Sequence, residues 1–182
     1  MPEIPPPRAP GKADFRATNA ASASQPLSAP ARLARQPSFQ PCPAETDDEL
    51  FANGIFEFNI TRMKAFIDAH PQRFPIDSVA IADIPDFGES GLTEAAIRAA
   101  ELSRPVLLAE IAPGHYNLID GNHRVARARR DGVPAIPVRR VASPAHVPFL
   151  TSTMAYEKYV EYWNGKIVDA GSGVAVGRRK RT

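Results

Sequence analysis

The chain has 182 residues, of which 43% are hydrophobic, and this is enough to build the core of one domain. It contains no stretch of 18 or more apolar residues and no apolar secretory core near its N-terminus, so we expect neither membrane insertion nor export by that route. Its single cysteine, Cys42, cannot form an internal disulfide, so a reducing, cytoplasmic location is expected.

The formal net charge of +2 is divided unevenly along the chain. Residues 47–177 hold 13 Lys and Arg against 17 Asp and Glu, whereas both ends are basic. An acidic body does not favour sequence-independent binding to duplex DNA, because such binding depends on neutralising phosphates. We therefore expect any contact with DNA to come from a local arginine cluster or from the basic tail at residues 178–181.

Residues 1–46 are predicted to form a disordered extension. Ten of the 19 prolines fall in this segment, among Ala, Ser and Gln, and apolar residues are too sparse to offset the entropy cost of ordering it. Such a segment serves as a tether or docks a partner protein. The remainder is divided into a folded domain at residues 47–168 and a flexible basic tail at residues 169–182.

Within the folded domain, the hydrophobic pattern predicts short helices and strands in alternation. Asn59 or Thr61, and later Thr93, are the expected N-caps, and Gly132 is the expected glycine after the fourth helix. This order predicts the α/β fold class, of the mixed α+β kind, in a single compact domain. Helices are expected at about 47–51, 60–69, 93–102, 122–130 and 154–163, and strands at 55–58, 79–82, 106–111, 116–119 and 135–141.

The segment Asp120-Gly121-Asn122-His123-Arg124 joins a predicted strand directly to the start of a predicted helix. A helix N-terminus presents unpaired backbone N–H groups and the positive end of the helix dipole, which together bind anions. Gly121 lets the backbone approach a ligand, and His123 and Arg124 add side-chain donors suited to phosphate. The sequence therefore predicts a phosphate site formed by Gly121, Asn122, His123 and Arg124.

The same segment also has a purely structural interpretation. Asp-Gly is a common turn, Asn is a good N-cap, and an Arg side chain often covers a helix with its aliphatic part. Arg127 and Arg130 follow Arg124 at steps of three residues, and this stripe is interpreted as a solvated helix face more readily than as a nucleic-acid groove. The four histidines show no spacing typical of a metal site, and His146 is expected in an ordinary loop.

The turn, the helix after it and the return segment Gly132-Val133-Pro134-Ala135-Ile136-Pro137-Val138 resemble the signature of the ParB/sulfiredoxin-like superfamily, often labelled ParB-like nucleases. The resemblance covers about residues 76–141. It implies a small mixed α/β domain that binds a nucleoside triphosphate at this turn. Carried over by position, Gly121 and Arg124 match the phosphate-binding residues of the superfamily, and His123 lies beside them.

The resemblance also implies a set of catalytic residues and a cofactor. Asp120 is expected close to a magnesium ion or a water, and is the candidate metal ligand. Glu89, in a loop flanked by glycines, is the candidate second carboxylate, although a solvated surface role is the alternative for it. With His123 and Arg124 on the phosphate, these residues form the candidate catalytic site, and the implied cofactor is Mg²⁺ with ATP or another nucleoside triphosphate.

Two departures from the superfamily pattern narrow the expected activities. Asn122 stands where sulfiredoxin has its cysteine, which argues against reduction of a sulfinic acid. Only about 40 residues follow the last predicted strand, so no helix-turn-helix domain of the kind found in chromosome-partition ParB proteins is visible.

Three functions remain as hypotheses. The first is an enzyme that hydrolyses ATP or another nucleoside triphosphate, or that cleaves DNA with Asp120 or Glu89 holding a metal. A short single-domain protein of this kind resembles the Osa-type plasmid fertility-inhibition group, which suppresses conjugative transfer, and its partner would be a protein of the conjugation or secretion machinery. The second is a nucleotide-switched module that docks a protein without turnover. The third is a small-molecule kinase acting on an amino acid.

Overall fold

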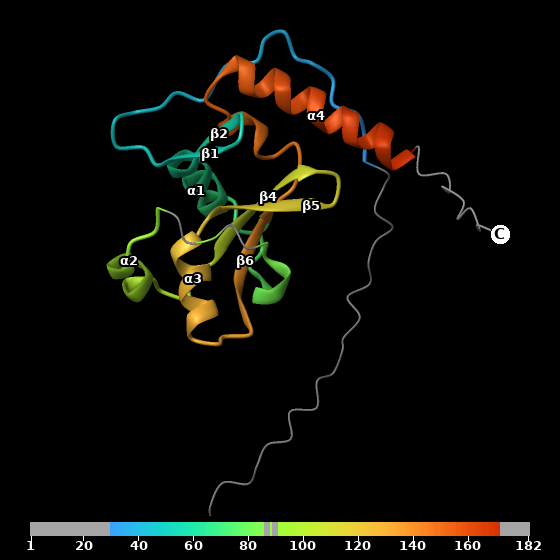
Figure 1. Ribbon diagram of the computed structural model, residues 1–182. Helices are drawn as coiled ribbons and strands as arrows, with labels where there is room; N and C mark the ends of the chain where they lie inside the picture. The colour runs from blue at the N-terminus through green and yellow to red at the C-terminus, as the bar shows by residue number, and fades with distance from the viewer. Residues whose placement is uncertain (1–29, 86–87, 89–90, 172–182) are drawn as a thin grey trace, which may run out of the picture.

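The computed structural model describes residues 30–85, 88 and 91–171 (Figure 1). The expected disorder of residues 1–29, the basic tail beyond Gly171 and the candidate carboxylate Glu89 all lie outside the described residues. The elements are, in chain order, β1 Leu50–Asn53, β2 Phe56–Asn59, α1 Ile60–Ala69, β3 Asp77–Ala80, the 3₁₀ turn η1 Ile81–Asp83, α2 Glu94–Ala99, β4 Val106–Ala112, β5 His115–Asp120, α3 Asn122–Arg130, β6 Ala135–Val141, the 3₁₀ turn η2 Val147–Phe149 and α4 Thr153–Gly171. The expected α/β class is confirmed.

A four-stranded mixed sheet with the order β3-β6-β4-β5 lies at the centre of the molecule. β4 forms an antiparallel hairpin with β5 and lies parallel to β6, which β3 extends antiparallel at the edge. The parallel pair requires a crossover, and α3 provides it between β5 and β6. The site-bearing turn therefore lies where β5 leaves the sheet and α3 begins.

The two faces of the sheet pack against different elements, and β4 supplies side chains to both. Leu107, Ala109 and Ile111 belong to a core shared with α1 and α4, whereas Val106 and Leu108 belong to a second core shared with α3. Alternate residues of a strand point to opposite faces, which explains this division. The nearly continuous apolar run of β4 is thus required because the strand is covered on both sides.

The segment expected to be a helix at residues 47–51 is instead the start of a β-hairpin. β1 pairs antiparallel with β2 around a turn at Gly54, which has a φ of 66°. Asp48, expected to open the helix, accepts hydrogen bonds from Asn59 Nδ2 and from the backbone N–H of Glu45. The helix prediction was wrong because strand pairing and this polar cluster outweigh a local capping pattern.

Several capping predictions are confirmed. The Asn59 side chain accepts a hydrogen bond from Arg62 N at the start of α1, and the Thr93 side chain accepts one from Ala96 N at the start of α2. Gly132 follows α3 with a φ of 67° and donates its N–H to Arg129 O, as expected for a helix ending in a left-handed residue.

Residues 30–46, which we call the strap, are ordered against α4 and belong to the folded domain. The folded part of the chain therefore begins before residue 47, which was the expected start of the domain. Trp163 Nε1 donates to Ala31 O at 3.0 Å, and the Asn164 side chain both accepts from Leu33 N and donates to Leu33 O, each at 2.9 Å. The strap forms no helix or strand of its own, so these α4 side chains supply hydrogen bonds to its backbone. Amino-acid composition alone does not reveal such contacts.

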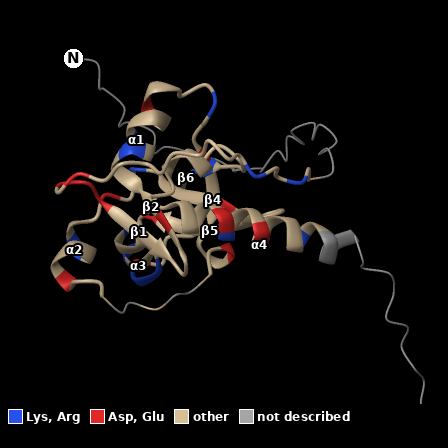
Figure 2. Ribbon diagram, turned by 90° about the horizontal axis from the view of Figure 1, so that it is seen from above, with Lys and Arg blue, Asp and Glu red and all other residues tan. Residues whose placement is uncertain are grey.

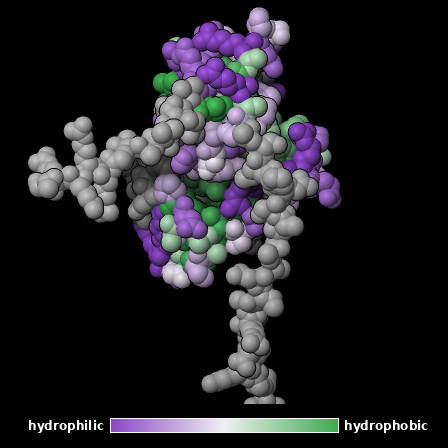
Figure 3. All heavy atoms as spheres, turned by 90° about the vertical axis from the view of Figure 1, so that its right-hand side faces the viewer, coloured by the Kyte–Doolittle hydropathy of each residue, from purple (hydrophilic) through white to green (hydrophobic). Residues whose placement is uncertain are grey.

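Helix α4 runs to Gly171, well past the expected end at Trp163. Its expected packing residues Tyr156, Tyr159, Val160 and Trp163 are all buried, as predicted. The top of the molecule, where α4 and the strap lie in Figure 1, is largely hydrophilic on the face shown in Figure 3, although α4 exposes Met154 and Tyr162. Across the part of the chain that the structure describes, no helix combines the length and apolar character needed to cross a membrane.

Candidate functional site

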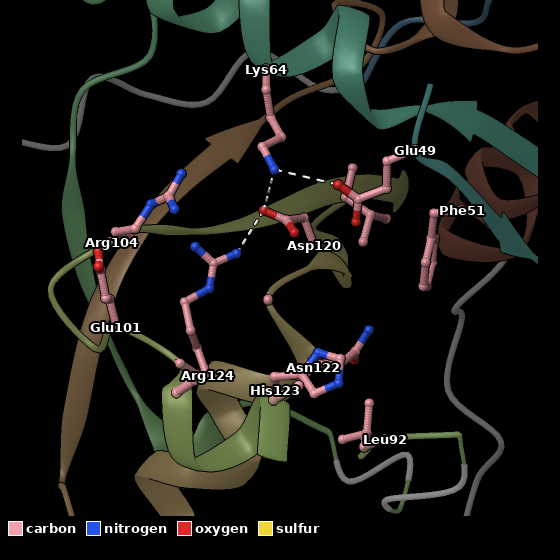
Figure 4. Close-up of a pocket in the computed structure, with 15 residues that line it drawn as sticks. Glu49, Phe51, Lys64, Leu92, Glu101, Arg104, Asp120, Asn122, His123 and Arg124 are labelled. Carbon is pink, nitrogen blue, oxygen red and sulfur yellow. Dashed lines mark hydrogen bonds and ion pairs between the residues drawn. The ribbon is translucent and has the colours of Figure 1, made fainter. Parts of the chain in front are cut away.

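A cleft of about 440 Å³ lies at the N-terminus of α3 (Figure 4). Asp120 at the end of β5 and the four residues after it form its floor, and Lys64 of α1 lies above them. Phe51 of β1 closes one side, and the segment after α2 closes the opposite side. All five residues of the predicted turn therefore face one cavity, together with side chains contributed by three other parts of the chain. These additional side chains are Glu49, Phe51, Lys64, Leu92, Glu101 and Arg104.

Gly121 is required by its backbone and by its neighbours. Its φ is 106°, and a Cβ atom there would lie 2.5 Å from Val106 Cγ1 and 2.9 Å from Arg124 Nη2. The absence of a side chain thus lets the turn pack directly against β4 and lets Arg124 fold back over it. The structure gives this glycine a packing role, whereas the sequence pattern predicted that it makes room for a ligand.

Asp120 and Arg124 form a largely buried ion pair. The Arg124 Nη2 to Asp120 Oδ2 distance is 2.7 Å, and Asp120 is only 9% exposed. Arg124 Nη1 also donates to Pro105 O at 3.0 Å, and Lys64 Nζ lies 3.7 Å from the same Asp120 oxygen. Arg124 is therefore held in one orientation, and a ligand anion that approaches it competes with the Asp120 carboxylate.

The N-terminus of α3 has no side-chain cap, because the N-cap residue is Gly121. The first backbone hydrogen bond of the helix runs from Val125 N to Gly121 O at 3.0 Å. The N–H groups of Asn122, His123 and Arg124 come before that bond, so the helix does not use them. They lie at the positive end of the helix dipole. Asn122 is the first helical residue and not the cap, so its side chain and that of His123 line the cleft.

The cleft carries a balanced set of charges. Lys64, Arg104 and Arg124 line it together with Glu49, Glu101 and Asp120. Lys64 Nζ lies between Glu49, at 3.4 Å, and Asp120. Among the described residues Arg104 is exposed and makes no ion pair, so it is the cation in the cleft with the least internal compensation. Figure 2 shows the same mixture, with basic residues on α1 and α3 and acidic residues near them.

The arginine stripe of α3 has a different role from the solvated face that was expected. Arg127 Nη1 donates to Arg98 O at 3.0 Å and to Ala100 O at 2.8 Å, and Arg130 Nη1 pairs with Glu94 at 2.6 Å. These bonds attach α2 and its C-terminal end to α3. The cause is that α2 is short and buries only one apolar side chain, Ile97, so hydrogen bonds from its longer neighbour hold it in place.

Sequence reasoning did not identify Lys64, Arg104 or Phe51 as site residues. Each is far from the turn in sequence, and no local motif distinguishes them from ordinary surface or hairpin residues. Only Arg104 has a distinctive neighbour in the sequence, because Pro105 follows it and ends the helical segment just before β4. Their convergence depends on the packing of α1 and the hairpin over the end of β5.

The arrangement does not fit a metal ion held by the protein. Within the described ranges, no group of three or more His, Cys, Asp or Glu side chains is placed to hold one. The candidate ligand Asp120 already shares its Oδ2 atom with Arg124 and Lys64. A divalent cation would have to arrive with a phosphate ligand, as magnesium commonly does.

A second polar cluster lies inside the α4-side core, away from the cleft. His146, expected in a loop, is fully buried, and its Nε2 lies 2.7 Å from Glu110 O. Burial lowers the pKa of His146 to about 4, because the charged imidazolium loses its hydration. The Tyr159 hydroxyl lies 3.3 Å from His146 Nε2 and donates to Ser143 Oγ at 2.9 Å. Burial raises the pKa of Tyr159. This cluster is a neutral structural network at physiological pH.

No family model, curated protein or solved structure matches the chain, so its function has to be argued from the cleft itself.

Proposed function

We propose that this protein binds a nucleoside triphosphate in the cleft at the N-terminus of α3 and hydrolyses it. One observation carries the proposal: the uncapped helix end opens into the same cavity as Lys64, Arg104 and Arg124. Backbone N–H groups at a helix end and converging cations are the donors that bind phosphate in proteins. The resemblance of the turn to the ParB/sulfiredoxin-like signature supports the same ligand.

The two ends of the cleft suit the two ends of a nucleotide. Phe51 and Leu92 offer apolar surface for the ring system on the side away from Arg104 (Figure 4). The first turn of α3, with the Asn122 and His123 side chains, receives the nearest phosphate. Arg124, oriented by Asp120, and the exposed Arg104 stabilise charge that develops on the phosphates during transfer to water. Asp120 in this scheme positions Arg124 and does not hold the magnesium ion.

A second candidate, nucleotide binding without turnover, is favoured by the state of Asp120. Arg124 and Lys64 both lie on its Oδ2 atom, so this oxygen is engaged in ion pairs and is not free to take a proton from an attacking water. A protein that binds and releases a nucleotide without hydrolysis would use the cleft as a switch for docking a partner. DNA cleavage finds no such support among the described residues, because the arginine stripe is engaged in bonds to α2.

Binding and turnover are tested together on the natural chain with ATP, CTP and GTP in the presence of Mg²⁺. Isothermal titration should show binding of at least one triphosphate, and release of inorganic phosphate should accompany it. We expect Arg104→Ala to weaken binding about tenfold, as loss of one charge-assisted contact does. Arg98→Ala is the control, because Arg98 is an exposed arginine of α2, six residues before Arg104, and does not line the cleft.

The outcomes separate the candidates. Binding with phosphate release supports the hydrolase, and binding without release supports the switch. If none of the three nucleotides binds, or if Arg98→Ala weakens binding as much as Arg104→Ala does, the assignment of the nucleotide to this cleft is wrong.

A further inference from the structure

A second cavity of about 230 Å³ adjoins the cleft, and we call it the side pocket. It shares four residues with the cleft: Lys64, Arg104, Asp120 and Arg124. These four side chains therefore stand at the border between the two cavities. Figure 4 shows the Lys64, Arg104 and Arg124 side chains arranged around the Asp120 carboxylate. A ligand that reaches this border from the helix end of the cleft has the side pocket directly beyond it.

The side pocket is more basic than the cleft. Four cations line it, because Arg139 of β6 joins Lys64, Arg104 and Arg124, and only two carboxylates, Asp68 and Asp120, oppose them. The cleft has three cations and three carboxylates. The excess positive charge thus belongs to the side pocket, whose lining includes neither Phe51 nor Glu49. Within a partly enclosed cavity such an excess favours a ligand with more than one negative charge.

Arg139 is the residue that distinguishes the side pocket. Its side chain is only 14% exposed, and its ion-pair partner Asp68 is 70% exposed. Its Nε atom is buried and has no hydrogen-bond partner in the described part of the chain. A nearly buried guanidinium with one solvated partner is incompletely compensated, and burial of such a group is costly. A bound anion beside the guanidinium head would offset its charge.

We propose that the side pocket binds the terminal phosphates of a polyphosphate chain whose first phosphate lies at the N-terminus of α3. This inference rests on the proposed function and adds its selectivity. Lys64, Arg104 and Arg124 bridge the two cavities, and Arg139 recognises the far end of the chain. The protein therefore selects triphosphates over monophosphates by charge and length, independently of the base.

The neighbouring residue on β6 provides a matched control. Arg140, like Arg139, pairs with one exposed carboxylate, in this case Asp77. Successive strand residues point to opposite sides, and Arg140 does not line the side pocket. Arg139→Met and Arg140→Met therefore remove the same charge and the same kind of ion pair, but only the first affects the pocket.

The experiment is isothermal titration of the full chain with ATP, AMP, inorganic tripolyphosphate and orthophosphate at fixed Mg²⁺. We expect ATP and tripolyphosphate to bind at least tenfold more tightly than AMP and orthophosphate. Arg139→Met should weaken ATP and tripolyphosphate about tenfold and leave AMP unchanged, because only the longer ligands reach that guanidinium. Arg140→Met should leave all four affinities unchanged.

A second pair of variants guards against misfolding of Arg139→Met. Asp68→Asn removes the exposed carboxylate that competes for Arg139, and should tighten tripolyphosphate binding a few-fold. Asp77→Asn, the same change opposite Arg140, should have no effect. Equal affinities for ATP and AMP in the natural chain would overturn the proposal that the side pocket binds the terminal phosphates. Equal effects of the two variants in either pair would overturn it as well.

Failure of the proposed function gives a different result. If tripolyphosphate binds in an Arg139-dependent manner but no nucleotide binds, the side pocket stands and the nucleotide assignment of the cleft is wrong. If no ligand binds at all, both proposals are wrong.

Discussion

The two faces of the central sheet are stabilised in different ways. The face towards α1 and α4 buries large aromatic side chains, among them Phe58, Tyr159 and Trp163. The buried core towards α3 is aliphatic and smaller, and its outer elements are attached through arginine hydrogen bonds to backbone carbonyls. The candidate site lies at the end of β5, where the aromatic core and the arginine-bonded elements meet. Apolar packing thus stabilises one face, while polar groups near the other remain available for a ligand.

The strongest test of this comparison removes one buried side chain from each face. Phe58→Ala should lower the free energy of unfolding by about 4 kcal/mol, because a fully buried phenyl ring leaves a cavity. Val125→Ala on α3 should cost about 2 kcal/mol, since it removes two methyl groups. Urea unfolding monitored by circular dichroism measures both. A larger loss for Val125→Ala would show that the α3 face contributes most of the stability.

The second test uses pH to probe the aromatic face alone. The pKa of His146 is about 4 in the folded protein, against an ordinary value of 6.5, so the neutral imidazole is favoured by folding. Its contribution is complete above pH 6.5 and is lost as the pH falls towards 4, where the loss levels off. This single group accounts for about 3 kcal/mol over that range. Urea unfolding at several pH values should show the decline.

The control for the pH experiment is His146→Phe, compared through the slope of stability against pH and not through absolute stability. The variant should lose most of the decline between pH 6.5 and 4 and keep the steeper loss of the carboxylates at lower pH. An unchanged slope would mean that another group titrates in this range, and that His146 is accessible to water.

The smallest expected effect concerns the strap. Asn164→Ala removes the two hydrogen bonds to Leu33 and should destabilise the strap by about 1–2 kcal/mol. Amide hydrogen exchange of residues 30–42 should accelerate, while exchange in β4 stays unchanged. Glu157→Ala, at an exposed position of α4, is the control. If the strap exchanges freely in the natural chain, it does not belong to the aromatic face and the domain begins later.

Local pattern was sufficient for much of the fold and for part of the site. The strands from β4 to β6 follow from short apolar segments bounded by turn residues, and the caps at Asn59 and Thr93 follow from side chains that act on adjacent backbone. The turn at Asp120–Arg124 was also recognisable, because its glycine, its helix start and its basic residues are contiguous.

The errors share a different cause, which is that distant contacts decided the outcome. Asp48 looks like a helix cap until Asn59 is brought beside it, and the strap looks disordered until Trp163 and Asn164 bind its backbone. Arg139 carries no local signal at all. Its significance arises only because β6 lies parallel to β4 and places it beside Arg124 at the side pocket.

The strap also has a consequence for how the protein is made. Its bond from Trp163 to Ala31 joins residues that are 132 positions apart. On the ribosome, the strap emerges before the helix that it packs against, so its backbone stays hydrated until α4 has left the exit tunnel. Contacts between such distant segments slow folding because a long loop has to close first. Docking of the strap and completion of the aromatic core should therefore be a late step in folding, after α4 has formed.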